Sequence, residues 1–297
     1  MRHLSLVLIG LGLAGCHAFG GSSGGAGAGG SLYFANCGEG CTLPDHPVAA
    51  GGAHTTINVT NLGFASVRSS DPTVATFSRN GQSIEVISGA PGTTELELLD
   101  AQGGLVTQAT LTVEATALLR VDHGWTGATP LILEGQPLAF HVTTLDAHGR
   151  TTKGSGAVSF ALDGSLAPTI VPVNGDAIGF VGSAGAGHVT ASCPDTSVTQ
   201  SFTVVPASAI TALTTSSQTL ANDSAIVSVV PESAAGAVYG GPCVWKSSDP
   251  SVTLASDVGP ALDLGPGTVS VFNLTRAGSF TVSCTLAGRT AMVTVSR

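Results

Sequence analysis

The sequence has little charge, and most of that charge is negative. Lys and Arg number 10 against 19 Asp and Glu, charged residues make up 10% of the 297 residues, and the net charge is −9. Apart from Arg2, the basic residues are scattered from Arg68 to Arg297, whereas proteins that bind phosphate backbones gather their cations in clusters. The sequence therefore argues against a nucleic-acid partner.

Helical patterns are also absent. No window carries a sustained helical apolar stripe flanked by Glu, Lys and Arg. By contrast, 40 Gly and 15 Pro in a chain that is 43% apolar indicate many short strands joined by tight turns. We therefore predict an all-β protein.

Aromatic residues are too few for a broad aromatic binding face, because only two Trp and two Tyr are present. Trp125, in HGWTGATP, is interpreted first as an inward residue of its domain. The alternative is a residue of a surface recognition site.

The apolar run at the N-terminus, from Leu4 to Leu13, is too short to cross a bilayer as a helix but suits the core of a signal peptide. Leu13-Ala14-Gly15-Cys16 resembles a bacterial lipobox. The resemblance implies a lipoprotein signal peptide over residues 1–16 and a lipidated Cys16, anchored in the cell envelope by its acyl chains. An ordinary secretory cleavage near the same place is the alternative. Because His17 replaces the Asp that favours inner-membrane retention, the resemblance also implies the outer membrane.

Residues 17–31, HAFGGSSGGAGAGGS, contain almost nothing to bury. Gly/Ser tracts of this kind behave as flexible coil, and fifteen residues span roughly 20 Å. We predict a tether that lifts the folded part from the lipid surface.

Three segments near the ends of successive thirds of the chain align at a fixed spacing. Val113 in TLTVEA, Val204 in SFTVVP and Val295 in MVTVSR are 91 residues apart. A period of this size indicates tandem small domains. We predict three units, over residues 32–116, 117–206 and 207–297.

An alternating run precedes each of these segments and opens near Gly92, Gly187 and Gly278. Period two with one apolar face is typical of a half-buried antiparallel strand. Gly and Asp clusters between alternating runs indicate hairpin turns. Each unit is therefore expected to end in a β-hairpin.

The phrase Ser-Ser-Asp-Pro occurs at residues 69–72 and again at 247–250, 178 residues later. Asp can accept a hydrogen bond from the backbone two residues on, and Pro denies a donor to the sheet, so the phrase predicts the end of a strand. Val67 and Trp245 are then the last inward residues of these strands. In unit two, Phe160 takes the corresponding place and Asp163-Gly164 is predicted to supply the turn.

Units one and three resemble bacterial Ig-like domains of group 2. Unit one carries SSDPTVATFSRNGQSIEVISGAPGTTELELL, and unit three carries WKSSDPSV and RAGSFTVS. Unit two, with HVTTLDAHGRTTKGSGAVSF, resembles the group 1 Ig-like domains of invasin-type proteins. The resemblance covers about residues 50–297 and implies one β-sandwich per unit, with about seven strands and Greek-key connections. Residues 32–51, with CGEGC and LPDHP, match no strand of the family.

Beyond Cys16, five cysteines remain, an odd number in an oxidising envelope compartment. Cys243 shares a strand face with Trp245 and Cys284 lies on an inward face, which favours a disulfide between them. Cys37 and Cys41 favour a second disulfide that closes CGEGC, with a metal site as the alternative. Cys193 is interpreted as a buried core thiol, with pairing between chains as the alternative.

No residue pattern typical of catalysis is found: the histidines show no HExxH spacing, and no Gly-x-Ser-x-Gly precedes a helix. The strongest metal candidate is Asp146-Ala147-His148-Gly149 with Asp163 or Asp176, and a plain hairpin turn is the preferred interpretation. We predict no catalytic centre, no metal and no cofactor, so the protein is not expected to be an enzyme.

Together these features predict a lipid-anchored cell-envelope protein of three tandem Ig-like sandwiches. The short junctions, ATALL and PASAI, predict a semi-rigid rod. Its expected role is structural, adhesive or docking, with a protein or polysaccharide partner. The alternative is an accessory subunit of an envelope complex that binds a saccharide or a secreted enzyme, for which an aromatic-lined face near Trp125 would be the sign.

Overall fold

The computed structural model describes residues 30–35, 41–121, 129–170, 176–220, 224–241, 243–259, 268–274 and 278–296. The predicted signal peptide with Cys16, nearly all of the tether, Cys37 and Trp125 lie outside these residues. The described regular structure is strand, apart from the single 3-10 turns η1 (Leu43–Asp45) and η2 (Ala207–Ala209). No helix in these ranges is long and apolar enough to cross a membrane. The all-β prediction is confirmed.

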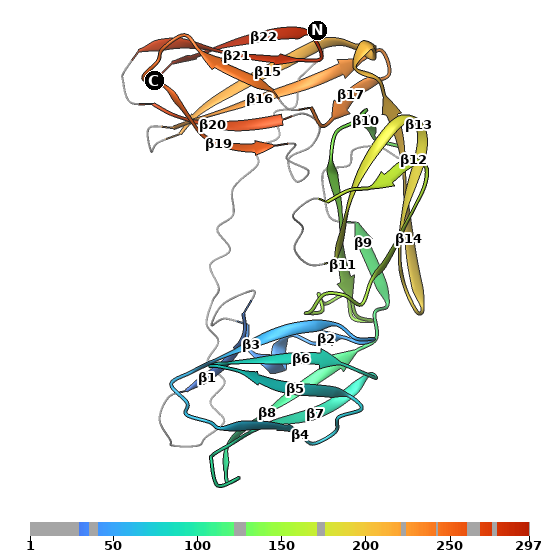
Figure 1. Ribbon diagram of the computed structural model, residues 1–297, viewed down its shortest axis with the longest axis vertical. Coiled ribbons are helices and arrows are strands. Elements are labelled where there is room, and N and C mark those ends of the chain that lie inside the picture. The colour runs from blue at the N-terminus through green and yellow to red at the C-terminus, as the bar shows by residue number, and fades with distance from the viewer. Residues whose placement is uncertain are drawn as a thin grey trace.

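Unit one is a sandwich of two four-stranded sheets, ordered β1-β3-β6-β5 and β2-β8-β7-β4 (Figure 1). The strands are β1 (Ser31–Phe34), β2 (Val48–Ala49), β3 (His54–Thr60), β4 (Ser66–Ser69), β5 (Ala75–Asn80), β6 (Ser83–Ser88), β7 (Gly92–Leu99) and β8 (Leu105–Glu114). Alternate side chains of these strands point into one core, which includes Ile57, Ile84 and Leu111 at 0% exposure. Burial of each such side chain contributes about 1.5–3 kcal/mol relative to exposure.

Unit two contains β9 (Leu118–Val121), β10 (Leu131–Leu133), β11 (Leu138–Leu145), β12 (Ser159–Pro168), β13 (Ala177–Cys193) and β14 (Thr196–Val205). The long strand β13 pairs with β11, β12 and β14 and so ties the unit together. Its core centres on Phe140, Phe180 and Phe202, all at 0% exposure. The Phe202 ring lies 5.3 Å from that of Phe180 and 6.4 Å, edge to face, from that of Phe140.

Unit three contains β15 (Ile210–Leu220), β16 (Ser224–Ser233), β17 (Gly236–Tyr239), β18 (Val244–Ser247), β19 (Thr253–Gly259), β20 (Thr268–Asn273), β21 (Ser279–Leu286) and β22 (Arg289–Ser296). One layer has the order β18-β21-β22, and β15, β16, β20 and β19 form the other. Trp245 packs against both hydrophobic clusters between the layers, and its ring meets that of Phe272 edge to face at 5.5 Å. The indole therefore links the two halves of this core.

The predicted hairpins are present in all three units, as β7–β8, β13–β14 and β21–β22. The valines that mark the 91-residue period, Val113, Val204 and Val295, lie in the last strand of each hairpin and are at most 3% exposed. The repeat seen in the sequence is therefore a repeat of inward core positions.

Ser-Ser-Asp-Pro ends β4 in unit one and β18 in unit three, as predicted. Asp71 Oδ1 accepts a 3.0 Å hydrogen bond from the N–H of Thr73, and Asp249 Oδ1 accepts one of 2.8 Å from the N–H of Ser251. The Thr73 hydroxyl also donates to Asp71, and these two bonds hold the pKa of Asp71 below its usual value. Both aspartates thus stabilise the turn that follows the strand.

The prediction of a turn at Asp163-Gly164 is wrong. β12 continues to Pro168, and the ladder with β13 only shifts its register between Gly164 and Leu166. Gly164 has φ +65°, and a Cβ there would lie 2.4 Å from the carbonyl oxygen of Ala186, so the glycine permits a β-bulge rather than a chain reversal. Residues 32–51 also contribute strands, because β1 pairs with β3 and β2 pairs with β8.

The units are arranged as an open bracket, whereas the short junctions predicted a semi-rigid rod. Figure 1 shows units one and three extending to the same side of unit two, which forms the back of the bracket. The bend has a cause in the strand pairing, because β17 of unit three adds to unit two in parallel with β10. One continuous sheet therefore runs through units two and three.

Candidate functional site

Units one and two are joined by backbone hydrogen bonds between segments about a hundred residues apart. The Lys153 N–H donates to Pro47 O at 2.7 Å, and the Ala49 N–H donates to Lys153 O at 2.9 Å. His54 and Ser155 exchange N–H···O bonds of 2.8 and 2.9 Å. Residues 153–155 of unit two thus pair with the edge of unit one, which fixes the junction more tightly than its connecting peptide would.

The loop that makes this contact begins at the turn 146–149, which was the strongest metal candidate. Asp146 Oδ1 accepts from the N–H groups of His148 and Arg150 at 2.8 and 2.9 Å, and Oδ2 accepts from Arg150 Nε at 2.7 Å. Burial by itself would raise the pKa of Asp146, but the bonds from Arg150 and His148 lower it overall. Both carboxylate oxygens of Asp146 accept hydrogen bonds from within the turn, which agrees with the preferred interpretation as a hairpin turn.

The other residues considered for a metal site serve separate purposes. Asp163 pairs with His188 Nδ1 at 2.8 Å on the solvent side of β12 and β13. Asp176 is only 8% exposed and accepts a 2.7 Å bond from the N–H of Gly156. Across the described ranges, no group of three or more His, Cys, Asp or Glu side chains could hold a metal ion.

Asp176 of unit two holds the loop of residues 153–157, which pairs with unit one and is called the docking loop below. Burial raises the pKa of its carboxyl above the usual value, although the N–H groups of Gly156 and Val158 oppose this by hydrogen bonding to it. Ala157, next in the loop, packs against the core of unit one. The loop is therefore held from both units.

Units two and three share apolar packing as well as a sheet. Leu131 and Ile132 of β10 pair in register with Val238 and Tyr239 of β17. Tyr239, at 2% exposure, belongs to the core of unit two although it lies in the sequence of unit three. Because Tyr239 of unit three is buried in the core of unit two, the junction between units two and three is expected to be stiff.

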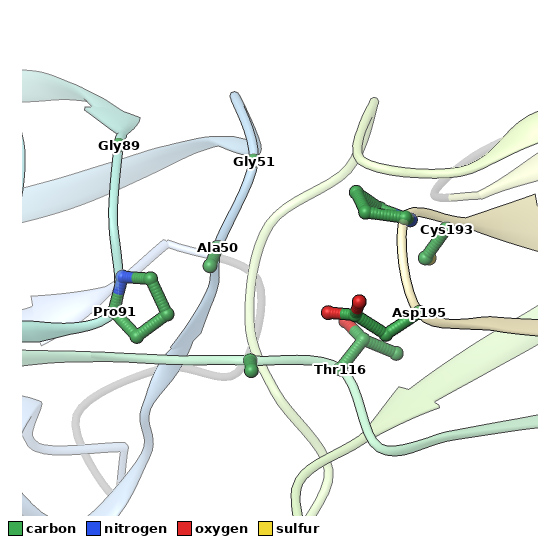
Figure 2. Close-up of a pocket in the computed structure, with 9 residues that line it drawn as sticks. Ala50, Gly51, Gly89, Pro91, Thr116, Cys193 and Asp195 are labelled. Carbon is green, nitrogen blue, oxygen red and sulfur yellow. The ribbon is translucent and has the colours of Figure 1, made fainter.

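A pocket of about 230 Å³ lies between units one and two (Figure 2). Figure 2 shows two opposite walls, one from unit one and the other with Thr116, Cys193 and Asp195. The unit-one wall is made of small residues: Ala50, Gly51, Gly89 and Pro91. A second hollow of about 420 Å³ adjoins it and shares Gly51, Cys193 and Pro194.

Two groups in this pocket, the Cys193 thiol and the Thr116 hydroxyl, lie beside each other. Cys193 is the free cysteine of the described residues and is partly buried at the end of β13. Burial raises the pKa of its thiol, the negative charge of Asp176 adds to this, and the Thr116 hydroxyl acts in the opposite direction. Thr116 is only 7% exposed, and apart from this interaction with the thiol its Oγ1 makes no hydrogen bond. Cys193 therefore packs against the core of unit two, as its interpretation as a core thiol requires, but it is only partly buried and faces the boundary with unit one.

The structure joins Cys243 and Cys284, the favoured pair, in a disulfide with a Cα–Cα distance of 5.2 Å. The bridge is buried beside Trp245 in unit three. Cys41 is also disulfide-bonded. Its predicted partner Cys37 lies outside the described residues, as does the lipidation candidate Cys16.

Sequence patterns did not reveal the pocket. Its walls come from four turns or strand ends of two units, and most of its residues are small ones that carry no chemical motif. One signal was available in the sequence. Cys193 of unit two aligns with Cys284 of unit three, but unit two has no cysteine at the position that aligns with Cys243, so Cys193 is left without a predicted disulfide partner.

Several solved structures of β-domain arrays are similar to this chain. Domains 4–9 of the surface layer protein SbsC match at 16% identity and a TM-score of 0.33, over 90% of this chain and 47% of that one. Invasin, a bacterial integrin-binding protein, matches at 12% identity and a TM-score of 0.28, over 90% and 58%. Domains A168–A170 of titin match at 13% identity and a TM-score of 0.26, over 83% and 91%.

The chain thus spans about half the length of the SbsC structure. No protein-family model matches the chain, and no curated protein sequence does. At these identities and TM-scores the function has to be inferred from this chain's own contacts.

Proposed function

We propose that this protein is a lipid-anchored module of the cell envelope that holds a stiff bracket of three sandwiches away from the membrane and docks another envelope component on it. The observation that carries the proposal is the backbone pairing at both junctions. Residues 153–155 pair with unit one, and β17 pairs with β10. Domains that merely follow one another on a chain do not need such pairing, because relative motion is their default.

The outer faces of the sheets suit a docking role. On unit two, small polar residues lie in rows across β12, β13 and β14, as in Ser159–Ser192–Ser197, and Thr190 of β13 lies opposite Thr199 of β14. The Thr190 and Thr199 hydroxyls lie 3.0 Å apart in a hydrogen bond. A sheet face of this kind offers many hydrogen-bonding groups, which favours a protein partner over a small sugar.

The anchoring part of the proposal depends on the N-terminal sequence, in which the lipobox-like Leu13-Ala14-Gly15-Cys16 precedes a Gly/Ser tract. Acyl chains on Cys16 would hold the bracket at a membrane, with the outer membrane as the proposed site. The group 2 and group 1 Ig-like assignments also remain part of this proposal.

Stiffness is tested by distance measurement between units. Spin labels are placed at exposed strand positions with the variants Ser78→Cys and Thr294→Cys, in a Cys193→Ser background. We expect one narrow distance distribution between units one and three. A broad distribution would show a flexible string of domains and overturn the bracket.

Anchoring is tested separately in the native host. Wild-type protein should carry acyl chains by intact mass and partition into detergent, and Cys16→Ser should lose both properties. If Cys16→Ser partitions like the wild type, Cys16 is not the anchor, whatever the stiffness measurement shows.

A further inference from the structure

We propose that the pocket between units one and two is a thiolation site, at which Cys193 forms a mixed disulfide with a small amino-thiol. This inference goes beyond the proposed docking function and does not depend on it. It starts from the position of Cys193, the free cysteine of the described residues, at the edge of both hollows.

The first argument is room. A hollow of about 230 Å³ is many times the ~30 Å³ of liquid that one water occupies, and it accepts an adduct with a few heavy atoms beyond the sulfur. The facing wall cannot fill it, because Ala50, Gly51 and Gly89 have no side chain beyond Cβ. In Figure 2, Pro91 and Ala50 lie on one side of the pocket and Cys193 and Asp195 on the other.

The second argument is an unsatisfied polar group on the same wall. Apart from the Cys193 thiol, Thr116 Oγ1 has no hydrogen-bond partner although the side chain is only 7% exposed, and native proteins pair nearly all such groups. Thr116 and Asp195 both line the pocket (Figure 2). A donor that enters the pocket would supply the missing partner.

The third argument is charge. Asp195 lines the pocket two residues beyond Cys193, and Asp176 acts on the thiol electrostatically. Neither Lys nor Arg lines the hollow. An ammonium group on the adduct can donate to the Asp195 carboxylate and to Thr116 Oγ1, whereas an anionic adduct would be repelled. The site therefore favours thiols that carry an amine.

The reaction is thiol–disulfide exchange. The Cys193 thiol loses its proton to solvent, and the thiolate attacks one sulfur of a small disulfide R–S–S–R. A bond forms between Cys193 Sγ and the attacked sulfur as the S–S bond of the small disulfide breaks, and the other half leaves with the electron pair as R–S⁻, which takes up a proton. The small disulfide is the oxidant, and no other co-reactant is required.

The test uses the purified mature chain and three disulfide probes: cystamine, which is cationic, 2-hydroxyethyl disulfide, which is neutral, and dithiodiglycolate, which is anionic. Rates of adduct formation are followed by intact mass at one mildly alkaline pH, and each adduct is located by peptide mapping. After correction for the intrinsic reactivity of each probe with a free cysteine peptide, we expect cystamine to react about three- to tenfold faster than dithiodiglycolate.

Matched variants distinguish selectivity that comes from the pocket from the reactivity of any exposed thiol. Asp195→Asn and Thr116→Val should each reduce the preference for cystamine severalfold. Asp195→Asn should leave the rate with 2-hydroxyethyl disulfide nearly unchanged, whereas Thr116→Val should slow all three probes, because the Thr116 hydroxyl lowers the pKa of the Cys193 thiol. Glu232→Gln removes one charge from unit three, far along the chain, and should change nothing. Cys193→Ser should form no adduct.

Three results would overturn the proposal. Equal corrected rates for the three probes would show a thiol without a selective pocket. A cystamine preference that survives Asp195→Asn would assign the selectivity elsewhere. An adduct that forms only when the chain is unfolded would show that the pocket is closed to ligands.

Discussion

Ser70 Oγ accepts a 2.8 Å hydrogen bond from the backbone N–H of Glu95, while the Ser70 N–H donates to Glu95 O at 3.0 Å. Unit three repeats the arrangement: Ser248 Oγ accepts from the Thr281 N–H at 2.8 Å, and the Ser248 N–H donates to Thr281 O at 2.9 Å. The hydroxyl of the second serine thus replaces a ladder carbonyl where the strand ends. This shared role at a strand end explains why Ser-Ser-Asp-Pro occurs in both units.

Removing that hydroxyl leaves a strand N–H without its partner. We expect Ser70→Ala and Ser248→Ala each to lower the free energy of unfolding by about 1 kcal/mol. Urea denaturation followed by circular dichroism measures the change. Ser78→Ala, on the exposed side of β5, is the matched control, and an equal effect of all three variants would contradict the capping role.

The Cys243–Cys284 disulfide closes a loop with a sequence separation of 41 residues. By the chain-entropy relation, removal of both cysteines as the Cys243→Ala/Cys284→Ala variant should lower stability by about 3–4 kcal/mol. Thermal denaturation should show the loss chiefly in unit three. Cys193→Ser, which closes no loop, should denature like the wild type. A double variant as stable as Cys193→Ser would show that the bridge contributes nothing.

Asp176 should make stability depend on pH in the opposite sense to a salt-bridged aspartate. Because burial raises the pKa of its carboxyl in the folded state, its contribution is most favourable below the unfolded value of about 3.9 and is lost as pH rises through the folded pKa. Asp176→Asn keeps an acceptor for the Gly156 N–H and carries no charge. We expect it to be more stable than the wild type at neutral pH, with the difference shrinking as the pH falls. Denaturation midpoints across pH measure this, and a difference that grows in acid would refute it.

Asp176→Ala is the informative companion variant. It removes the acceptor and leaves the N–H of Gly156 unpaired at a buried position, which costs about 1–3 kcal/mol. At neutral pH it should be less stable than both Asp176→Asn and the wild type.

Gly154 allows the docking loop to approach unit one. It has φ +99°, and a Cβ at this position would lie 2.9 Å from Ala53 Cβ. Gly149→Ala is a matched control, because Gly149 also has a positive φ, +76°, but a Cβ there meets nothing within 4 Å. Both variants bear the cost of an L residue at positive φ, about 1 kcal/mol. Only Gly154→Ala should also loosen the junction, seen as a larger radius of gyration in small-angle X-ray scattering. An equal radius for the two variants would contradict this.

Trp245 should tolerate loss of its polar atom better than loss of its ring. Its Nε1 is buried without a hydrogen-bond partner, whereas its ring packs against Phe272 and both clusters of unit three. Trp245→Phe should cost no more than about 1.5 kcal/mol and Trp245→Ala about 3–5 kcal/mol, measured by urea denaturation. Equal losses would show that the ring is not the stabilising part.

Local patterns predicted the elements that depend on neighbours in sequence. Alternation along Thr94, Leu96 and Leu98 predicted an inward face, and these residues are at most 2% exposed. The 91-residue period predicted the closing hairpins, because an inward valine and the turn before it are set by local geometry. The prediction of a turn at Asp163-Gly164 was wrong because it also used only local sequence. Pairing of Leu166 with Gly182, which is distant in sequence, keeps the strand going past this site.

The sequence by itself determined the class of fold, the repeat, the strand endings and the favoured disulfide, since each depends on side-chain periodicity, turn chemistry or a shared strand face. Only the tertiary structure decided how the units meet. The pairing of Lys153 with Pro47 and Ala49, the pairing of β17 with β10, and the pocket beside Cys193 are contacts between backbone segments or small residues far apart in the chain. Backbone hydrogen bonds and small side chains leave almost no trace in residue identity, so such contacts become visible only once the chain is folded.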